Sequence, residues 1–271
     1  MRIEVTVGDI TESQVDGLIV SLCEDTERGS APGSAVIAVD SALGGAIGAL
    51  LDSHGIKGKP NEVTVLHSLG RLPAKLVAVC GLGKQGEVTV DRVRDATAEG
   101  CRALRRLGCQ SIGTTVIGSG SVGLDPEVCA RTIAEGAVLG LYSFTKYKAP
   151  EGGEVEHLSI VTRDTNVKDG LAQAVEVGVV LGEATNLSRD MVNEPANYMT
   201  PSRMAEIAIE VGTKYGLGVT VLDKDDMVSM RMGALLGVAQ GSAEPPKFIR
   251  IDYDGTDTEA PRTALIGKAI T

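Results

Sequence analysis

Apolar positions in the amino-terminal half of this 271-residue chain follow strand-like and helix-like spacing in turn. Short runs rich in β-branched residues, which are typical of strands, occur at residues 3–7, 17–21, 62–67, 76–80, 111–117 and 157–162. Helical patterns lie between them at residues 34–51, 91–107 and 126–139. Strands that alternate with helices predict an α/β fold with a mostly parallel sheet covered on both faces.

A second region follows, in which a helical pattern runs from residue 167 to residue 189 without a breaker. Another helix is predicted at residues 201–215, with Thr200 as its N-cap and Pro201 at its first position, where a missing N–H costs nothing. Further strands are predicted at residues 219–222, 248–253 and 263–266. We place the boundary near Asp164, which gives two domains, 1–163 and 164–271, bridged by the long helix.

The composition is that of an ordinary globular protein, with 43% apolar and 23% charged residues. No apolar run approaches the roughly 18 residues that a membrane helix needs, and Met1 is not followed by the apolar region of a signal peptide. We therefore expect a soluble, cytoplasmic protein without a membrane partner.

Charge and cysteine usage count against two further classes, nucleic-acid-binding proteins and disulfide-linked proteins. A net charge of −10 repels nucleic-acid phosphates, so nucleic acid is not an expected partner. The five cysteines form no C-x-x-C pair and are odd in number, which favours buried, reduced thiols over disulfides. They are Cys23, Cys80, Cys101, Cys109 and Cys129.

Two glycine motifs invite a nucleotide interpretation that the surrounding residues do not support. Residues 81–86 match G-x-G-x-x-G, but the following helix is predicted to begin near Asp91, and the next strand ends in residues 117–120 without an acidic residue for a ribose. Gly267 and Lys268 lack the earlier glycine and the following Ser or Thr of a phosphate loop. We predict a tight turn at residues 81–86 and no cofactor-binding residue.

The three histidines, His54, His67 and His157, are scattered along the chain without metal-binding spacing. An imidazole- or thiolate-based zinc site is therefore not predicted.

Three segments of the second region carry a family resemblance. They are residues 186–201, which include Asn193-Glu194-Pro195-Ala196-Asn197, residues 232–246, and the closing run Ala264-Leu265-Ile266-Gly267-Lys268. Together they resemble the cytosol or leucine aminopeptidase family, whose members are two-metal exopeptidases. The resemblance implies a macro-domain-like domain at residues 1–163, followed at residues 164–271 by an incomplete α/β metallo-exopeptidase domain.

The resemblance also implies a function and its partners. It implies a cytoplasmic hydrolase that removes amino-terminal residues from peptides with two Mn or Zn ions and that forms a homo-hexamer when complete. Asn193 and Glu194 flank Pro195 as a helix-ending turn requires, so we expect this segment to be a turn and not to carry chemistry.

Lys268 is the one metal ligand that the resemblance transfers to this chain, because it follows the predicted strand where the family places a coordinating lysine. An amine ligates only when it is neutral, and burial favours that form. The family's other ligands lie beyond residue 271, so we expect no catalytic residue, no bound metal and no activity in this chain alone. Two alternatives stay open: a nucleotide- or ADP-ribose-binding module built on the macro-like domain, and a DNA-binding relative.

Overall fold

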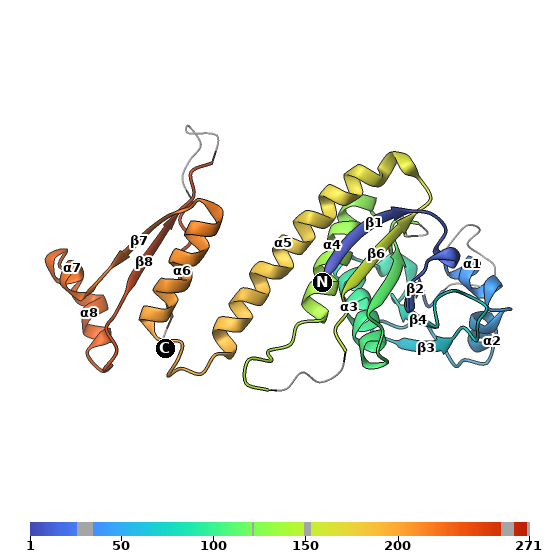
Figure 1. Ribbon diagram of the computed structural model, residues 1–271, viewed down its shortest axis with the longest axis horizontal. Coiled ribbons are helices and arrows are strands. Elements are labelled where there is room, and N and C mark those ends of the chain that lie inside the picture. The colour runs from blue at the N-terminus through green and yellow to red at the C-terminus, as the bar shows by residue number, and fades with distance from the viewer. Residues whose placement is uncertain (26–34, 121, 149–152, 256–262, 270–271) are drawn as a thin grey trace. The chain divides into compact units, whose positions relative to one another are not determined.

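The computed structural model describes residues 1–25, 35–120, 122–148, 153–255 and 263–269 (Figure 1). By compactness they divide into two units, Met1–Leu187 and Ser188–Thr271.

The first unit is built on a six-stranded sheet, which confirms the predicted α/β architecture. Its strands are β1 (Arg2–Val7), β2 (Gly17–Leu22), β3 (Val63–His67), β4 (Leu76–Gly81), β5 (Ser111–Thr115) and β6 (His157–Thr162). The strand order is β1-β6-β5-β2-β4-β3, and every pair is parallel except β3 with β4. The predicted strand at residues 111–117 is thus two residues shorter in the structure, because the chain turns after Thr115.

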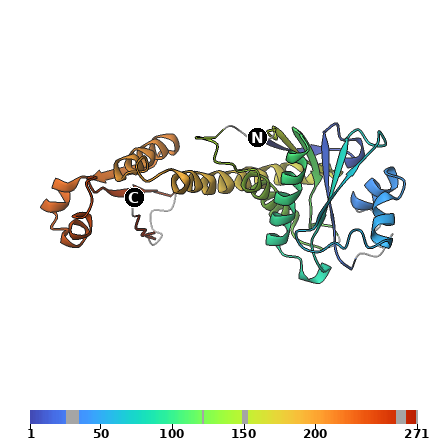
Figure 2. The ribbon, with the colours of Figure 1, turned by 90° about the horizontal axis from the view of Figure 1, so that it is seen from below.

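Helices cover both faces of this sheet, as Figures 1 and 2 show. One face carries α1 (Ala35–Ala42) and α2 (Ala46–Asp52), and the other carries α3 (Val90–Arg106), α4 (Pro126–Gly140) and the first part of α5 (Lys168–Asn193). Because successive strand residues point to opposite faces, Leu18 and Val20 of β2 join the core beneath α1 and α2, whereas Ile19 joins the core beneath α3 and α4.

The helix predicted at residues 34–51 is in fact two helices, and residue 34 lies outside the described residues. The break falls at Gly44 and Gly45, which have φ angles of +71° and +82°. Glycine adopts such positive φ angles without strain. Asp40 then accepts hydrogen bonds from Ile47 N at 2.7 Å and Gly48 N at 3.2 Å, which caps the start of α2. In the described part of the chain no single helix is long and apolar enough to cross a bilayer, and α1 with α2 reaches that length only as a pair bent by 104°.

Glycines let α3, α4 and α5 pack with their backbones in close contact. A Cβ at Gly136 of α4 would lie 2.6 Å from the carbonyl oxygen of Arg94 in α3. A Cβ at Gly178 of α5 would overlap the carbonyl oxygen of Arg131 in α4. Beyond these contacts, Leu171 and Val175 of α5 are buried in the core of the first unit.

The described part of the second unit holds three helices and a two-stranded sheet. Its elements are α6 (Pro201–Tyr215), β7 (Gly218–Leu222), α7 (Lys224–Ser229), α8 (Gly233–Ala239) and β8 (Phe248–Asp252), and β7 pairs antiparallel with β8. The N-cap prediction for α6 is confirmed, since Thr200 Oγ1 accepts a hydrogen bond from Arg203 N at 3.3 Å. The short helices α7 and α8 were not predicted.

Three 3-10 turns complete the described elements: Ile10–Glu12, Gln85–Glu87 and Thr165–Val167. The predicted domain boundary between residues 163 and 164 stays a prediction, and the compact units divide later, within α5.

Asp16 ties together the amino-terminal ends of three neighbouring strands. Its carboxylate accepts hydrogen bonds from Ser111 Oγ at 2.8 Å, Ser111 N at 3.0 Å and Gln110 N at 3.1 Å, just before and at the start of β5. Its carbonyl oxygen accepts from the backbone N–H groups of Lys75 and Leu76, where β4 begins. The hydrogen bond from the Ser111 side chain is the main cause that lowers the pKa of Asp16, although desolvation opposes it.

We predict that Gly178→Ala destabilises the first unit, whereas Gly170→Ala in the same helix does not. An exposed Gly→Ala change in a helix stabilises by up to about 1 kcal/mol, but at Gly178 the new Cβ has to push α5 away from α4, at a cost of about 1 to 3 kcal/mol. A Cβ at Gly170 meets only the movable end of the Glu127 side chain. Urea unfolding of both variants measures the difference, and equal free energies of unfolding would contradict the close packing.

Acid should remove the contribution of the Asp16 carboxylate to the free energy of unfolding. Because its pKa is lowered in the folded state, its stabilisation is present above the unfolded-state pKa of about 3.9 and is lost as the pH falls through the folded-state value. We expect Asp16→Asn to cost about 1 to 3 kcal/mol at pH 7 and much less at pH 2, as measured by urea unfolding. Asp95→Asn, on the exposed side of α3, is the control and should change little at either pH.

Candidate functional site

Lys268, the one predicted metal ligand, lies in a segment that forms neither a helix nor a strand. The described residues 263–269 have no regular secondary structure, so the strand predicted at residues 263–266 is wrong for this chain. A strand needs a hydrogen-bonded neighbour, and none of the described strands pairs with this segment. Lys268 is exposed, and Leu265 and Ile266 before it are 97% and 95% exposed.

The described residues do not assemble a metal site around this lysine or elsewhere. Nowhere in the described ranges do three or more His, Cys, Asp or Glu side chains come together in a group that could hold a metal ion. A two-metal centre needs several anionic oxygens placed together. The residues present therefore do not fit such a centre by themselves.

The signature segment at residues 193–200 forms the end of one helix and the cap of the next. Helix α5 ends at Asn193, and the carbonyl oxygen of Pro195 accepts hydrogen bonds from Tyr198 N at 2.8 Å and Met199 N at 2.9 Å. Met199 is buried, and Thr200 then caps α6. The predicted turn is confirmed.

The glycines at residues 81–86 allow neighbouring backbone segments to approach one another closely. A Cβ on Gly81 would overlap the carbonyl oxygen of Lys59, and Gly83, with φ +82°, donates its N–H to Gly58 O at 2.8 Å. Helix α3 begins only at Val90. A dinucleotide site requires the helix to open at the glycines, and that requirement is not met here.

All five cysteines are buried, which confirms that prediction. Burial raises the pKa of Cys101 to about 12 and that of Cys129 to about 11, and it also raises the pKa of Cys80. A thiol acts as a nucleophile or metal ligand only as thiolate. These cysteines are therefore packing residues.

The histidines lie exposed on separate elements of the first unit. His54 follows α2, His67 ends β3, and His157 begins β6. The structure does not bring them together with other ligands.

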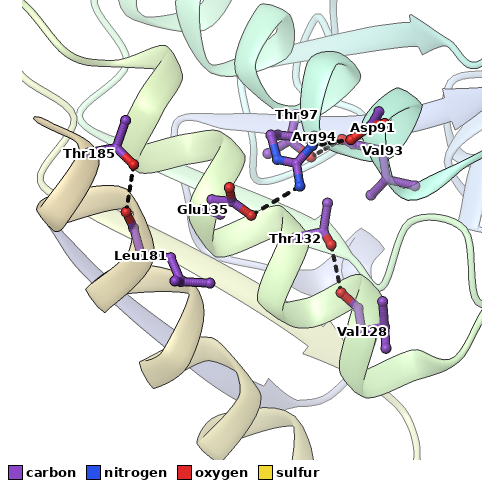
Figure 3. Close-up of polar contacts among 9 residues, drawn as sticks. All are labelled: Asp91, Val93, Arg94, Thr97, Val128, Thr132, Glu135, Leu181 and Thr185. Carbon is purple, nitrogen blue, oxygen red and sulfur yellow. Dashed lines mark hydrogen bonds and ion pairs between the residues drawn. The ribbon is translucent and has the colours of Figure 1, made fainter. Parts of the chain in front are cut away.

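Sequence reasoning missed an ion-pair cluster between α3 and α4, shown in Figure 3. Arg94 pairs with Asp91 one turn earlier in α3 and with Glu135 of α4, where the N–O distance is 3.2 Å. Burial opposes the charge on Arg94, but the hydrogen bonds to these two carboxylates outweigh it and raise the pKa of the guanidinium. The i, i+3 spacing of Asp91 and Arg94 is visible in the sequence and indicates an ion pair within the helix. The pairing of Arg94 with Glu135, 41 residues later, has no such local signal.

Two family models match the chain in sequence order. The N-terminal domain of the cytosol aminopeptidase family matches residues 19–151, and the catalytic domain of the same family matches residues 186–271.

Curated relatives agree with these matches. A protein of Alkaliphilus oremlandii named "Probable cytosol aminopeptidase" is 34% identical over 274 residues, and one of the same name from Geobacter sulfurreducens is 35% identical over 274 residues. Each alignment covers 100% of this chain and 54% of the relative. The chain thus spans about half the length of the curated relatives it matches.

Solved structures share the fold. A mutant of tomato leucine aminopeptidase superposes with a TM-score of 0.80 at 22% identity, over 95% of this chain and 52% of that one. The bottromycin maturation enzyme BotP in complex with Mn gives a TM-score of 0.69 at 27% identity, over 90% of this chain and 46% of that one.

The burial of the thiols predicts their reactivity. We expect native protein to leave all five cysteines unmodified by Ellman's reagent on the minute timescale, and to expose all five in denaturing urea. Absorbance at the thionitrobenzoate maximum counts the reacted thiols in both states. Rapid labelling of any thiol in native protein would show that its segment opens.

Proposed function

Because this chain belongs to the cytosol aminopeptidase family, we propose that it is the amino-terminal half of a peptidase that removes amino-terminal residues from peptides. The observation that carries the proposal is the order of the two family matches, an N-terminal domain followed by a catalytic domain. The 34% and 35% identities, which extend over the whole chain, support it.

We further propose that the 271-residue chain alone does not hydrolyse peptides. Its described residues bring together no group of carboxylates that could hold metal ions, so we assign no catalytic step to them. The chain spans about half the length of the curated relatives it matches, and the resemblance implies that most of the family's metal ligands belong to the other half.

Lys268 is the residue that we propose for metal binding in the complete enzyme. The support is its place after Ala264-Leu265-Ile266-Gly267, inside the stretch that the catalytic-domain model matches, where the resemblance to the family implies a coordinating lysine. In this chain the lysine is exposed, whereas a neutral, ligating amine is favoured by burial. We propose that burial comes with the remaining part of the catalytic domain, together with Mn or Zn.

The other properties of the whole protein are proposals of the same kind. They are a peptide substrate, a cytoplasmic location and a homo-hexameric assembly. The names of the relatives support the first two, since they are called cytosol aminopeptidases.

Hydrolysis of leucine p-nitroanilide tests the proposal. We expect the chain with added Mn or Zn to release nitroaniline no faster than its Lys268→Ala variant, because a single ligand cannot hold the metals. The full-length Geobacter sulfurreducens relative serves as the positive control. Turnover by this chain clearly above that of Lys268→Ala would contradict the proposed inactivity.

A further inference from the structure

Strand β3 forms one outer edge of the six-stranded sheet in the first unit. It is the last strand in the order β1-β6-β5-β2-β4-β3, and of the described strands only β4 pairs with it (Figure 1). All strands of this sheet lie between Arg2 and Thr162, and the core on each of its faces is made by the same unit. The edge of β3 therefore belongs to a sheet whose strands and core both come from the first unit.

The hydrogen bonds to β4 show which backbone groups of β3 face outward. Gly81 N donates to Glu62 O at 2.8 Å, and Ser68 N donates to Lys75 O at 2.9 Å. In an antiparallel pair, every second residue forms such bonds to the neighbouring strand. The odd-numbered residues between these two positions therefore direct their N–H and C=O groups toward the outer edge. They are Val63, Val65 and His67.

The two outer strands of the sheet differ in charge. Strand β1, at the opposite edge, carries Arg2 and Glu4, which form an ion pair at 3.0 Å. Strand β3 has the sequence Val-Thr-Val-Leu-His, without a proline or an Asp, Glu, Lys or Arg residue. Charged residues and prolines on an edge strand discourage the addition of a further strand. Because β3 lacks both, its edge favours strand addition.

Basic side chains flank β3 at both ends. Between α2 and β4 the chain contains four Lys or Arg residues and one acidic residue, although its net charge as a whole is −10. Lys57 and Lys59 lie before the strand, Arg71 lies in the turn after it, and all three are exposed. Arg71 donates to the carbonyl oxygen of Leu43 at 2.6 Å, which anchors the guanidinium without neutralising its charge.

The one acidic residue of this stretch, Glu62, offsets only part of the positive charge. Its carboxylate accepts hydrogen bonds at 3.0 Å from the backbone N–H groups of Lys57 and Lys59. Glu24 and Asp25 follow β2, and β4 separates that strand from β3. In an antiparallel pair of two β3 edges, basic residues at the start of one strand would meet those at the end of the other. The charges therefore favour an acidic partner over a second copy of this edge.

Leu69, in the turn after β3, is held in solvent in a strained conformation. Arg71 N donates to Ser68 O at 3.0 Å, and the two residues between them, Leu69 and Gly70, have φ angles of +52° and +80°. Gly, Asn and Asp favour such turn positions, whereas a leucine is strained there. The Leu69 side chain is 87% exposed. It thus adds neither turn preference nor burial to the fold, and a side chain held rigidly in solvent is suited to anchor a partner.

We propose that the surface formed by Val63–His67 with Lys57, Lys59, Leu69 and Arg71 binds an extended acidic segment of a partner protein by strand addition. We call this surface the basic edge. The partner's backbone pairs with the outward groups of β3, its carboxylates lie near the basic residues at both ends, and an apolar side chain contacts Leu69. Backbone hydrogen bonds give such strand addition its affinity, and side-chain contacts give its specificity. The inference does not depend on peptidase activity.

Fluorescein-labelled synthetic peptides test the basic edge on the full chain by fluorescence anisotropy. The acidic probe is a short peptide with alternating valine and threonine in its centre and glutamates at both ends. One control peptide carries lysines in place of the glutamates, and the other has N-methylated central valines, which cannot donate backbone hydrogen bonds. We expect the acidic probe to bind at least about ten-fold more tightly than either control peptide.

A charge reversal tests the electrostatic part of the basic edge. Lys59→Glu should weaken binding of the acidic probe at least about ten-fold, because an attractive charge becomes a repulsive one. Lys168→Glu, at an exposed position of α5, is the matched control and should bind like the unmodified chain.

A second variant separates binding from folding. Leu69→Asn should weaken binding of the acidic probe at least about ten-fold, because the apolar anchor is lost. The same change should leave the midpoint of urea unfolding unchanged or raise it, because asparagine favours the positive φ angle of this turn. Leu181→Asn is the matched control, since Leu181 of α5 is 45% exposed, and it should bind the probe normally.

Three results would overturn the basic edge. The first is equal affinity for the acidic and the lysine peptide, or normal binding by both Lys59→Glu and Leu69→Asn. The second is binding of a DNA duplex, but not of the acidic probe, that Lys59→Glu removes. The third is self-association of the chain that Leu69→Asn abolishes, since a second copy would then be the occupant. None of these measurements uses peptide hydrolysis, so failure of the proposed function would leave the basic edge in place.

Discussion

Close backbone packing of α4 against α3 and α5 is the constraint on which the first unit depends. Gly136 and Gly140 of α4 leave room for α3 to approach closely. Gly178 and Gly182 of α5 do the same for α4. Because the helices approach so closely, Leu171 and Val175 of α5 reach the core that β2, β4, β5 and β6 form with α3 and α4. Larger residues at the four glycines would separate the helices, so this face of the sheet would lose its cover.

The fold could be predicted where its signals are local. Runs of β-branched residues placed the eight strands of the described residues within a few positions, and Thr200 with Pro201 marked the start of α6. Signals that depend on distant partners failed. The run at residues 263–266 has the composition of a strand, but a strand also needs a neighbour, and no described strand provides one. The break between α1 and α2 was missed because Asp40 caps a helix seven residues later, after two glycines.

For the candidate site, too, the predictions that depend on nearby residues succeeded, and those that depend on distant partners did not. The turn at Pro195 and the burial of the cysteines follow from nearby residues, and both predictions hold. The role of Lys268 depends on further ligands, which the described residues do not bring together, and it stays a proposal. The two units differ for a related reason. The first unit buries one cluster of apolar side chains on each face of its sheet. In the second unit, apolar side chains of β8 and those of Leu265 and Ile266 are exposed.

The hydrogen bonds of Asp16 all lie at the amino-terminal end of the sheet, where they join the starts of β2, β4 and β5. These hydrogen bonds hold the three strands in alignment at one end of the sheet, in addition to the pairing along the strands. Connections after the carboxyl ends of the strands can therefore gain or lose residues without shifting the strands against one another. Divergence among homologues should concentrate in those connections, while an acidic residue persists at position 16.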